Sequence, residues 1–160
     1  NSHSMSEVPD VDAILDRAGF DPSESVLTRR QAEVLALRER GIPQADIAEV
    51  LGTSRANVSK VEASARDNVS KARETVAFAE TLQAPVQVTI EPGTDLYEVP
   101  DLVYEGCDDA GVKVPYSAPE VMKMVSDAAG DAIAGREVRQ HVLVGITSDG
   151  TMRVRQEPED

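Results

Sequence analysis

Residues 44–60 have the sequence QADIAEVLGTSRANVSK, which predicts two helices joined by a tight turn. The apolar residues of the first helix fall on one face, and Gly52 ends that helix. Ser54 is a favourable N-cap for the second helix, in which Val58 points inward. Ala48 is small at the position where the two helices must cross closely. This arrangement has the spacing of a helix-turn-helix motif.

Two more helices are predicted before this motif. Thr28 and Gln31 have the spacing of a capping box, in which a hydroxyl accepts from a backbone N–H and a Gln side chain reaches back. The helix that they open ends at Gly41. Residues 10–18 carry apolar side chains at helical spacing and predict a short amphipathic helix that ends at Gly19.

The helix that begins at Ser54 carries polar and small side chains outside the predicted core. Arg can pair with the edge of guanine and Asn with the edge of adenine, and small residues let a helix approach the floor of the major groove. In this motif the N-terminal residues of the second helix contact base edges. We therefore expect base readout by Arg55, Ala56, Asn57, Ser59 and Lys60, with Arg55, Asn57 and Lys60 as the first candidates. The alternative is a three-helix core with a solvated face, which requires none of this chemistry.

Charge is distributed unevenly along the 160 residues. The formal net charge is −13, which argues against a protein that coats nucleic acid or binds a membrane through a basic surface. Residues 29–73 nevertheless carry a charge of +3, between −5 in residues 1–28 and −11 in residues 74–160. The basic window is a candidate surface for binding a polyanion.

Several side chains in and beside this window are candidates for contacts with DNA phosphates. Such contacts position a protein on the duplex without reading the sequence. The candidates are Thr28, Arg29, Arg30, Gln44, Ser54, Arg66, Lys71 and Arg73. The alternative for the last three is that they are solvated helix charges paired with Glu62 and Asp67.

Residues 59–82 continue the second helix of the motif and carry an apolar stripe at spacings of three and four. The members of the stripe are Val61, Ala65, Val69, Ala72, Val76 and Ala79. Such a stripe must be buried, against the helix-turn-helix core, the C-terminal half or a second copy of the chain. The helical pattern stops at Ala84-Pro85, which places a domain boundary at residues 82–86.

The acidic second half predicts a mixture of strands and helices. Alternating apolar residues predict a strand at residues 86–90. Pro100 and Pro119 each open a helix, and these helices close at Gly111 and Gly130.

A hairpin is predicted at the C-terminus around Ser148-Asp149-Gly150. A two-residue turn would place Ile146 opposite Arg153, whereas a three-residue loop with a left-handed glycine places Ile146 opposite Met152. Because the register follows the buried face, we expect the three-residue loop. The segment Lys113-Val114 is a candidate for a further short strand.

The expected fold class is α+β, with an N-terminal all-α helix-turn-helix domain followed by a small α+β domain that ends in a β-hairpin. The expected parts of the chain are a tag remnant (1–4), an extension with a short helix (5–26), the helix-turn-helix domain with its following helix (27–83), an acidic α+β dimerisation or effector domain (84–156) and a tail (157–160).

Little in the chain points to catalysis. Cys107 is the only cysteine and His141 the only histidine after Met5, so no metal cluster or nucleophile–base pair has recognisable spacing. The chain has no Walker loop and no dinucleotide fingerprint. We therefore expect no enzymatic activity, no metal and no cofactor. A redox role for Cys107 is disfavoured because its acidic neighbours raise the pKa of the thiol.

Four arginines of the second half have two interpretations. They could converge on a small-molecule or anionic effector, or they could lie on an exposed face of the sheet. These residues are Arg136, Arg139, Arg153 and Arg155.

Composition also bears on the location of the protein. A single cysteine excludes a disulfide framework, and no apolar run approaches the roughly 20 residues that span a bilayer. We therefore expect a cytoplasmic protein that does not bind membranes. The many acidic residues and the excess of Arg over Lys are similar to the proteins of salt-loving archaea, and an ordinary acidic bacterial protein is the alternative.

Two segments resemble the archaeal Tfx-type transcriptional regulators, namely residues 27–35 (LTRRQAEVL) and 44–59 (QADIAEVLGTSRANVS). The first helices also resemble the promoter-binding region of bacterial sigma factors and LuxR-type heads. The resemblance to Tfx continues in residues 65–68 (ARDN), 71–75 (KARET), 93–97 (GTDLY) and 144–147 (VGIT). It therefore covers most of the chain after residue 26 and implies a DNA-binding transcription factor.

One residue departs from the Tfx pattern. Pro43 stands where the family usually has Ser or Thr as the cap of a helix, and loss of such a cap costs about 1 kcal/mol. Asp46 in the first turn offsets part of this loss through the helix dipole.

These observations predict a sequence-specific transcriptional regulator that binds double-stranded DNA. One short recognition helix covers few base pairs, so we expect a homodimer with half-sites about one helical turn apart. The C-terminal domain is expected to oligomerise, to sense an effector, or both. The alternative is a protein-interaction module, such as an antitoxin or a basal-transcription-factor adaptor, that acts through its acidic half.

Overall fold

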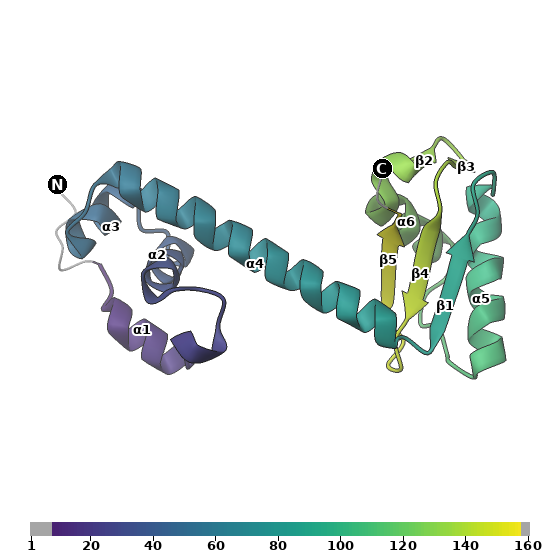
Figure 1. Cartoon of the computed structure of the whole chain (residues 1–160), viewed down its shortest axis with the longest axis horizontal. Helices are drawn as coiled ribbons and strands as arrows, with labels where there is room; N and C mark the ends of the chain where they lie inside the picture. Colours follow the sequence, from purple (N-terminus) through teal and green to yellow (C-terminus); the bar gives the residue numbers. More distant parts are fainter. Residues whose placement is uncertain (1–7, 158–160) are drawn as a thin grey trace. The chain divides into compact units, whose positions relative to one another are not determined.

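A computed structural model describes residues 8–157 of the chain (Figure 1). The chain divides into two compact units, Asn1–Thr75 and Val76–Asp160. The division falls inside one long helix, and the boundary expected at residues 82–86 lies where that helix ends.

The first unit contains only helices. They are α1 (Val11–Ala18), the short 3-10 helix η2 (Pro22–Glu24), α2 (Arg29–Glu39), α3 (Gln44–Leu51) and the first part of α4 (Arg55–Gln83). Its core brings together one or two apolar residues from each α-helix, with Val34, Leu37, Ile47 and Val58 almost fully buried. Ala48, at 6% exposed, keeps the crossing of the helices close, as expected from its size.

The predicted local signals of the helix-turn-helix are confirmed. The Thr28 hydroxyl accepts from the Gln31 N–H at 3.2 Å, and the Gln31 side chain accepts from the Thr28 N–H at 3.0 Å. Gly52 ends α3 in the left-handed conformation, with φ 69°. The Ser54 hydroxyl accepts from the Asn57 N–H at 3.0 Å and caps α4.

Thr28→Ala should lower the free energy of unfolding of the first unit by about 1 kcal/mol, because it removes the hydroxyl half of the capping box. Hydrogen exchange of the α2 amides measures this loss. Thr75→Ala is the control, since the Thr75 hydroxyl is exposed and bonds only to the carbonyl four residues earlier in its own helix. An equal effect of the two substitutions would contradict a capping role for Thr28.

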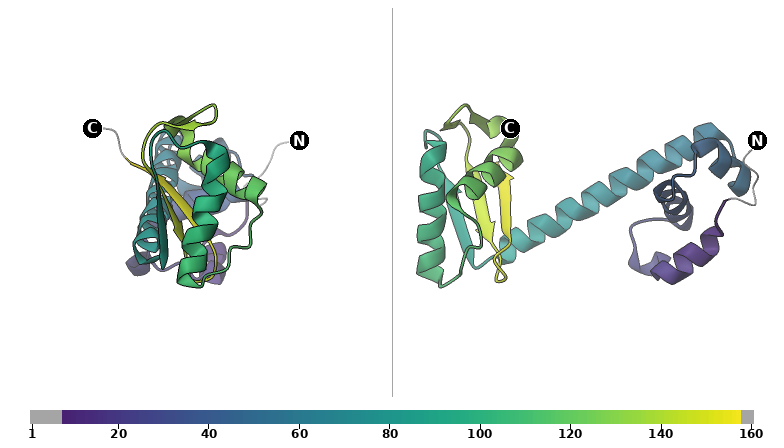
Figure 2. Two further views of the ribbon diagram at one scale, coloured as in Figure 1. Left: turned by 90° about the vertical axis from the view of Figure 1, so that its right-hand side faces the viewer. Right: turned by 180° about the vertical axis from the view of Figure 1, so that it is seen from behind.

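The second unit is a small α+β layer structure. It contains β1 (Val86–Ile90), η3 (Leu96–Glu98), α5 (Val99–Ala110), α6 (Ala118–Ala129), η4 (Gly130–Ala132), β2 (Ile133–Ala134), β3 (Glu137–Val138), β4 (Val142–Ile146) and β5 (Met152–Gln156). The main sheet is antiparallel, in the order β1-β4-β5, and both α5 and α6 pack on one of its faces (Figure 2). The end of α4 packs on the other face, where Thr81 is 3% exposed.

Strand alternation separates the two faces of this sheet. Val86, Ile90, Val142, Val144, Ile146 and Met152 enter the core with residues of α5 and α6. On the opposite face one row crosses all three strands, from Thr89 on β1 to Leu143 on β4 and Arg155 on β5. This second face is only partly covered, since Thr89 is exposed and Leu143 and Arg155 are half-buried.

The predicted register of the C-terminal hairpin is confirmed. Ile146 pairs with Met152, and the Thr147 N–H donates to the Thr151 carbonyl at 2.9 Å, which leaves a three-residue loop. Gly150 has φ 88°, the left-handed conformation that this loop requires.

The expected α+β class is confirmed, with helices of a helix-turn-helix first and a small α+β unit that ends in a hairpin after them, but the strand expected at Lys113-Val114 is wrong. The segment alternates in burial like a strand, with Val112, Val114 and Tyr116 packed against the core. It pairs with no described strand, and Pro115 has no N–H to donate to one. The two-residue strands β2 and β3 were not predicted, because a pair this short leaves no alternation to detect.

The apolar stripe of α4 is covered at its beginning and exposed further along. Ala65 is fully buried in the first unit, whereas Val76 is 57% exposed in the second. Phe78 and Leu82, outside the stripe, are 48% and 63% exposed. The last two turns of α4 therefore present large apolar side chains to solvent.

Candidate nucleic-acid interface

The five predicted base-reading residues lie on the first two turns of α4. All five, Arg55, Ala56, Asn57, Ser59 and Lys60, are exposed. Within the described part of the chain, neither Arg55 nor Lys60 forms an ion pair. Val58, between them in sequence, is 1% exposed and packs in the core. Burial of Val58 thus holds the other side chains outward.

Asn57 is held by two hydrogen bonds at the start of the helix. Its backbone N–H donates to the Ser54 hydroxyl, and its side-chain Nδ2 donates to Thr53 Oγ1 at 3.0 Å. The second bond fixes the side-chain amide relative to the turn. A base that Asn57 reads must therefore share or replace the bond to Thr53.

A buried carboxylate joins α2, α3 and α4 behind this surface. Glu62 is 8% exposed, and its Oε1 accepts from Arg38 Nε at 3.0 Å and from Gln44 Nε2 at 2.8 Å. Its other oxygen accepts from Arg66 Nε at 2.8 Å. Arg38 also donates to the Ile42 carbonyl at 3.0 Å, which ties the turn before α3 to the same cluster. We call Arg38, Gln44, Glu62 and Arg66 the Glu62 cluster.

The cluster keeps Glu62 ionised. Burial alone raises the pKa of this carboxyl, but the hydrogen bonds from Gln44 and Arg66 and the charges of Arg38 and Arg66 outweigh it and lower the pKa below its ordinary value. A buried carboxylate with three charged or polar donors is stable only while all three helices keep their positions. The Glu62 cluster therefore fixes how α4 projects from the motif.

The predicted phosphate-contacting residues occupy several different environments. Arg29 lies 2.9 Å from Asp12 and 3.6 Å from Glu33, and Arg30 lies 3.4 Å from Glu33. The hydroxyls of Thr28 and Ser54 cap helices. All four residues remain exposed. A DNA phosphate at these positions would either replace the ion pairs and capping bonds described here or be bound in addition to them.

The four other candidates for phosphate contacts differ in whether a carboxylate of the protein already binds them. Arg66 pairs with Glu62 at 2.8 Å and Lys71 with Asp67 at 3.1 Å, as in the paired-charge alternative, and Gln44 also bonds Glu62. Arg73 is exposed and makes no ion pair with a described residue. Among the described residues no side chain caps α3, and the Asp46 N–H donates to the Pro43 carbonyl at 3.1 Å. The N-terminus of α3 is the electropositive end of the helix dipole.

Only part of the Glu62 cluster could be predicted from the sequence. Glu62 and Arg66 are four residues apart in one helix, which favours their pairing. Arg38 and Gln44 lie 24 and 18 residues from Glu62, and nothing local links them. Asn68 Nδ2 donates to Gln31 Oε1 at 3.2 Å, and this second hydrogen bond between α2 and α4 was not predicted from the sequence.

The four arginines of the second unit do not form one site. Arg136 lies 2.6 Å from Asp95 and 4.4 Å from the centre of the Tyr97 ring, and Arg139 lies 3.8 Å from Glu137. On β5, Arg153 lies 2.6 Å from Glu80, and Arg155 lies over the Phe78 ring at 5.4 Å. Arg153 and Arg155 share one sheet face, whereas Arg136 and Arg139 belong to the β2–β3 region.

Cys107 is buried and has no feature of a reactive cysteine. Cys107 is 2% exposed, and burial together with the charge of Asp108 raises the pKa of its thiol. No group of three metal-ligating side chains occurs among residues 8–157. In the same residues, no helix combines the length and hydropathy needed to cross a bilayer.

Both units of the chain match models of known protein families. The first matches the model for region 4 of sigma-70 factors over residues 25–71. The second matches the model described as the C-terminal part of the DNA-binding protein Tfx over residues 72–154.

Three archaeal relatives align along most of the chain. A Haloarcula marismortui protein is 54% identical over 94% of this chain and 95% of its own length, and one from Methanocaldococcus jannaschii is 38% identical over 82% and 96%. Both carry the name "Putative transcriptional regulatory protein". The DNA-binding protein Tfx of Methanothermobacter thermautotrophicus is 34% identical over 82% of this chain and 95% of its own. With a sigma-type helix-turn-helix at the start of α4 and a Tfx C-terminal unit after it, the chain belongs to the Tfx family of DNA-binding proteins.

Proposed function

We propose that this protein is a sequence-specific DNA-binding transcriptional regulator that reads the major groove with the first turns of α4. The observation that carries the proposal is the exposure of Arg55, Ala56, Asn57, Ser59 and Lys60 beside the buried Val58. Val58 anchors one side of this helix end in the core, and the exposed side carries hydrogen-bond donors that can contact base edges.

Each exposed side chain has a role in this proposal. Arg55 donates two hydrogen bonds to guanine, and Asn57 pairs with adenine. Lys60 lies one turn further along and contacts a base or its phosphate. Ala56 and Ser59 are small and allow the helix to approach the groove floor.

Phosphate contacts flank the reading surface in the proposal. Arg29 and Arg30 at the start of α2, the uncapped N-terminus of α3 and Arg73 on α4 position the motif, and the exposed hydroxyls of Thr28 and Ser54 add hydrogen bonds. Gln44, Arg66 and Lys71 contribute mainly through their partners Glu62 and Asp67.

The regulator acts as a homodimer in this proposal, because one short helix covers too few base pairs for useful specificity. The second unit supplies the contact between copies and a surface on which an effector can act. A protein of this kind works in the cytoplasm beside the chromosome.

Fluorescence anisotropy tests the proposal with duplex DNA from the protein's own promoter and a scrambled duplex, across a potassium chloride series. Affinity for both duplexes should fall as salt rises, because phosphate contacts release counterions. Affinity for the promoter should remain at least 10³-fold above that for the scrambled duplex at each salt concentration. Equal affinity for the two duplexes throughout the series would refute sequence-specific recognition.

The alternative function, a protein-interaction module, has two observations in its favour. Residues 74–160 carry a charge of −11, and large apolar side chains are exposed at the end of α4. If this function holds, the double substitution Arg55→Glu and Lys60→Glu leaves partner binding unchanged.

A further inference from the structure

Thr53 lies in the turn between α3 and α4, next to the residues proposed to contact DNA. Its backbone N–H donates to the Ala48 carbonyl at 2.9 Å, and the preceding Gly52 ends α3 in the left-handed conformation. Thr53 is half-buried, whereas most of its neighbours along the turn are exposed. The position of Thr53 is therefore fixed by the end of α3 before any DNA is bound.

The Thr53 hydroxyl holds the side-chain amide of Asn57. Thr53 Oγ1 accepts from Asn57 Nδ2 at 3.0 Å, and the Ser54 hydroxyl accepts from the Asn57 backbone N–H at 3.0 Å. Because Asn57 is exposed, its side chain would be free to rotate without the first of these bonds. Two adjacent residues of the turn thus hold both the backbone and the side chain of Asn57.

The bond to Thr53 determines which atoms of the amide are left for a base. An Asn side chain has two N–H donors and one carbonyl oxygen, and one of the two donors is bound to Thr53. The second N–H and the Oδ1 oxygen remain. Adenine presents the matching pair in the major groove, the N7 acceptor and the N6 amino donor, whereas guanine presents two acceptors.

We propose that Thr53 is a positioning residue for base readout, which orients the Asn57 amide so that it selects adenine. The inference rests on the proposed function and adds a residue that determines specificity without contacting a base itself. A freely rotating side chain must be immobilised when it binds, whereas Asn57 is oriented in advance. Guanine and thymine are disfavoured, because each would place a carbonyl oxygen against Oδ1.

Thr53→Val tests this assignment, because valine has nearly the shape of threonine and lacks the hydroxyl. The dissociation constant of the full-length protein for the promoter duplex should rise about 2- to 12-fold, the cost of immobilising one free side chain. Affinity for the scrambled duplex should not change. Thr53→Ser keeps the hydroxyl and should restore most of the wild-type affinity for the promoter.

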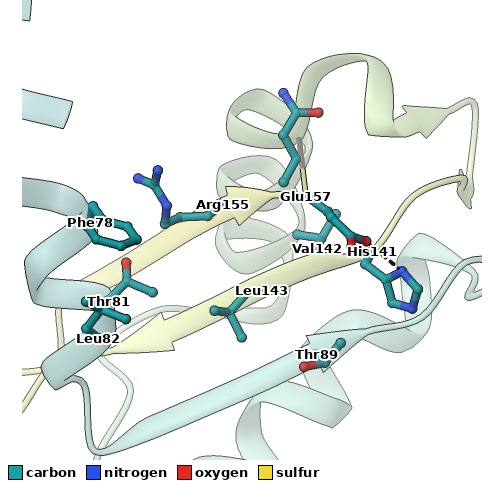
Figure 3. Close-up of a pocket in the computed structure, with 10 residues that line it drawn as sticks. Phe78, Thr81, Leu82, Thr89, His141, Val142, Leu143, Arg155 and Glu157 are labelled. Atoms are coloured by element: carbon teal, nitrogen blue, oxygen red, sulfur yellow. Dashed lines mark ion pairs between the residues drawn. The ribbon is translucent and has the colours of Figure 1, made fainter. Parts of the chain in front are cut away.

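Thr89→Val is the matched control for the loss of a threonine hydroxyl. Thr89 is exposed on β1 and lines a cleft between the sheet and the end of α4 in the second unit (Figure 3). It is not part of the surface proposed to contact DNA, so this substitution should leave the affinity for both duplexes unchanged. Circular dichroism checks that all variants remain folded.

A double-mutant cycle separates positioning from a structural role. If Thr53 acts through Asn57, Thr53→Val should not weaken promoter binding further when Asn57 is already replaced by Ala. NMR of the free protein reports the bond itself, because the Nδ2 proton bound to Thr53 should move to the position of a solvated amide in Thr53→Val. A distorted turn would instead weaken binding to both duplexes, with or without Asn57.

Replacement of each promoter base pair in turn identifies the base. The position at which Asn57→Ala abolishes discrimination should carry adenine, and Thr53→Val should reduce the preference for adenine at that position alone. A wild-type preference for guanine or thymine there would overturn the proposed orientation of the amide.

Two failures can be told apart. Equal affinity of the wild type for the promoter and scrambled duplexes would refute the proposed function and, with it, this assignment. Wild-type specificity that Thr53→Val leaves unchanged, or a loss that is equal on both duplexes or equally large in the Asn57→Ala background, would overturn the assignment alone.

Discussion

Replacing Arg55 by Ala should weaken binding to the promoter duplex by about 1–3 kcal/mol, or about 5- to 150-fold, and leave binding to scrambled DNA nearly unchanged. Arg55 is exposed, has no ion pair within residues 8–157, and begins the helix that we propose enters the major groove. Its guanidinium can donate two hydrogen bonds to guanine O6 and N7. Loss of both bonds affects only a site with that guanine, so specificity falls together with affinity.

Arg40→Ala is the matched control for this substitution. It removes the same charge from an exposed position on the turn between α2 and α3. Any loss that it causes should be equal on both duplexes. Replacing each promoter guanine in turn by 7-deazaguanine, which lacks N7, identifies the guanine that Arg55 contacts. At that position the substitution should weaken binding of the wild type but not of Arg55→Ala. Equal losses on promoter and scrambled DNA for Arg55→Ala would make Arg55 a phosphate contact.

Glu62→Ala should lower the free energy of unfolding of the first unit by about 2–4 kcal/mol. The substitution removes a carboxylate that is 8% exposed and leaves Arg38 and Gln44 without their acceptor. The expected loss of stability is smaller than for a fully buried ion pair, because the Arg38 and Arg66 side chains are 32% and 52% exposed. Hydrogen exchange of the α2 and α3 amides reports this unit separately from the second.

Asp67→Ala is the control for the loss of a helix carboxylate. The Asp67 and Lys71 side chains are 61% and 76% exposed, so their pair should contribute less than about 0.5 kcal/mol. A similar small effect of Glu62→Ala would show that the Glu62 cluster does not hold the three helices together.

The contribution of Glu62 to the stability of the first unit should decrease as the pH falls. Because the folded protein lowers the pKa of this carboxyl, the ionised form stabilises the fold, and this contribution is complete above the unfolded pKa of about 4.3. It is lost as the pH falls through the folded value. The stability difference between wild type and Glu62→Ala should therefore be constant above about pH 5.5 and shrink on acidification. A difference that does not change on acidification would contradict the assignment.

Features fixed by neighbouring residues were predictable from the sequence. The Thr28–Gln31 capping box, the left-handed Gly52 and the Ser54 cap each involve residues at most three apart. The hairpin register followed from burial, because only one pairing placed Ile146 opposite Met152. For the same reason the outward position of Arg55 and Lys60 followed from the inward position of Val58.

Features that join distant parts of the chain were not predictable in this way. Pairing of β1 with β4 places Val88 opposite Val144, and no local pattern selects that partner. Arg38 meets Glu62 only because α2 and α4 pack together, 24 residues apart in sequence. Alternation at Val112 and Val114 predicted a strand, but alternation records burial and does not supply a hydrogen-bonding neighbour.

The recognition surface at the start of α4 is tested most directly by NMR, with amide chemical shifts followed as the promoter duplex is added. We expect the largest shifts at residues 54–60 and at the N-terminus of α3, with smaller shifts at the start of α2. The scrambled duplex should shift mainly the phosphate-contacting positions. Shifts confined to residues 76–157, with the first turns of α4 unaffected, would contradict DNA recognition by this helix.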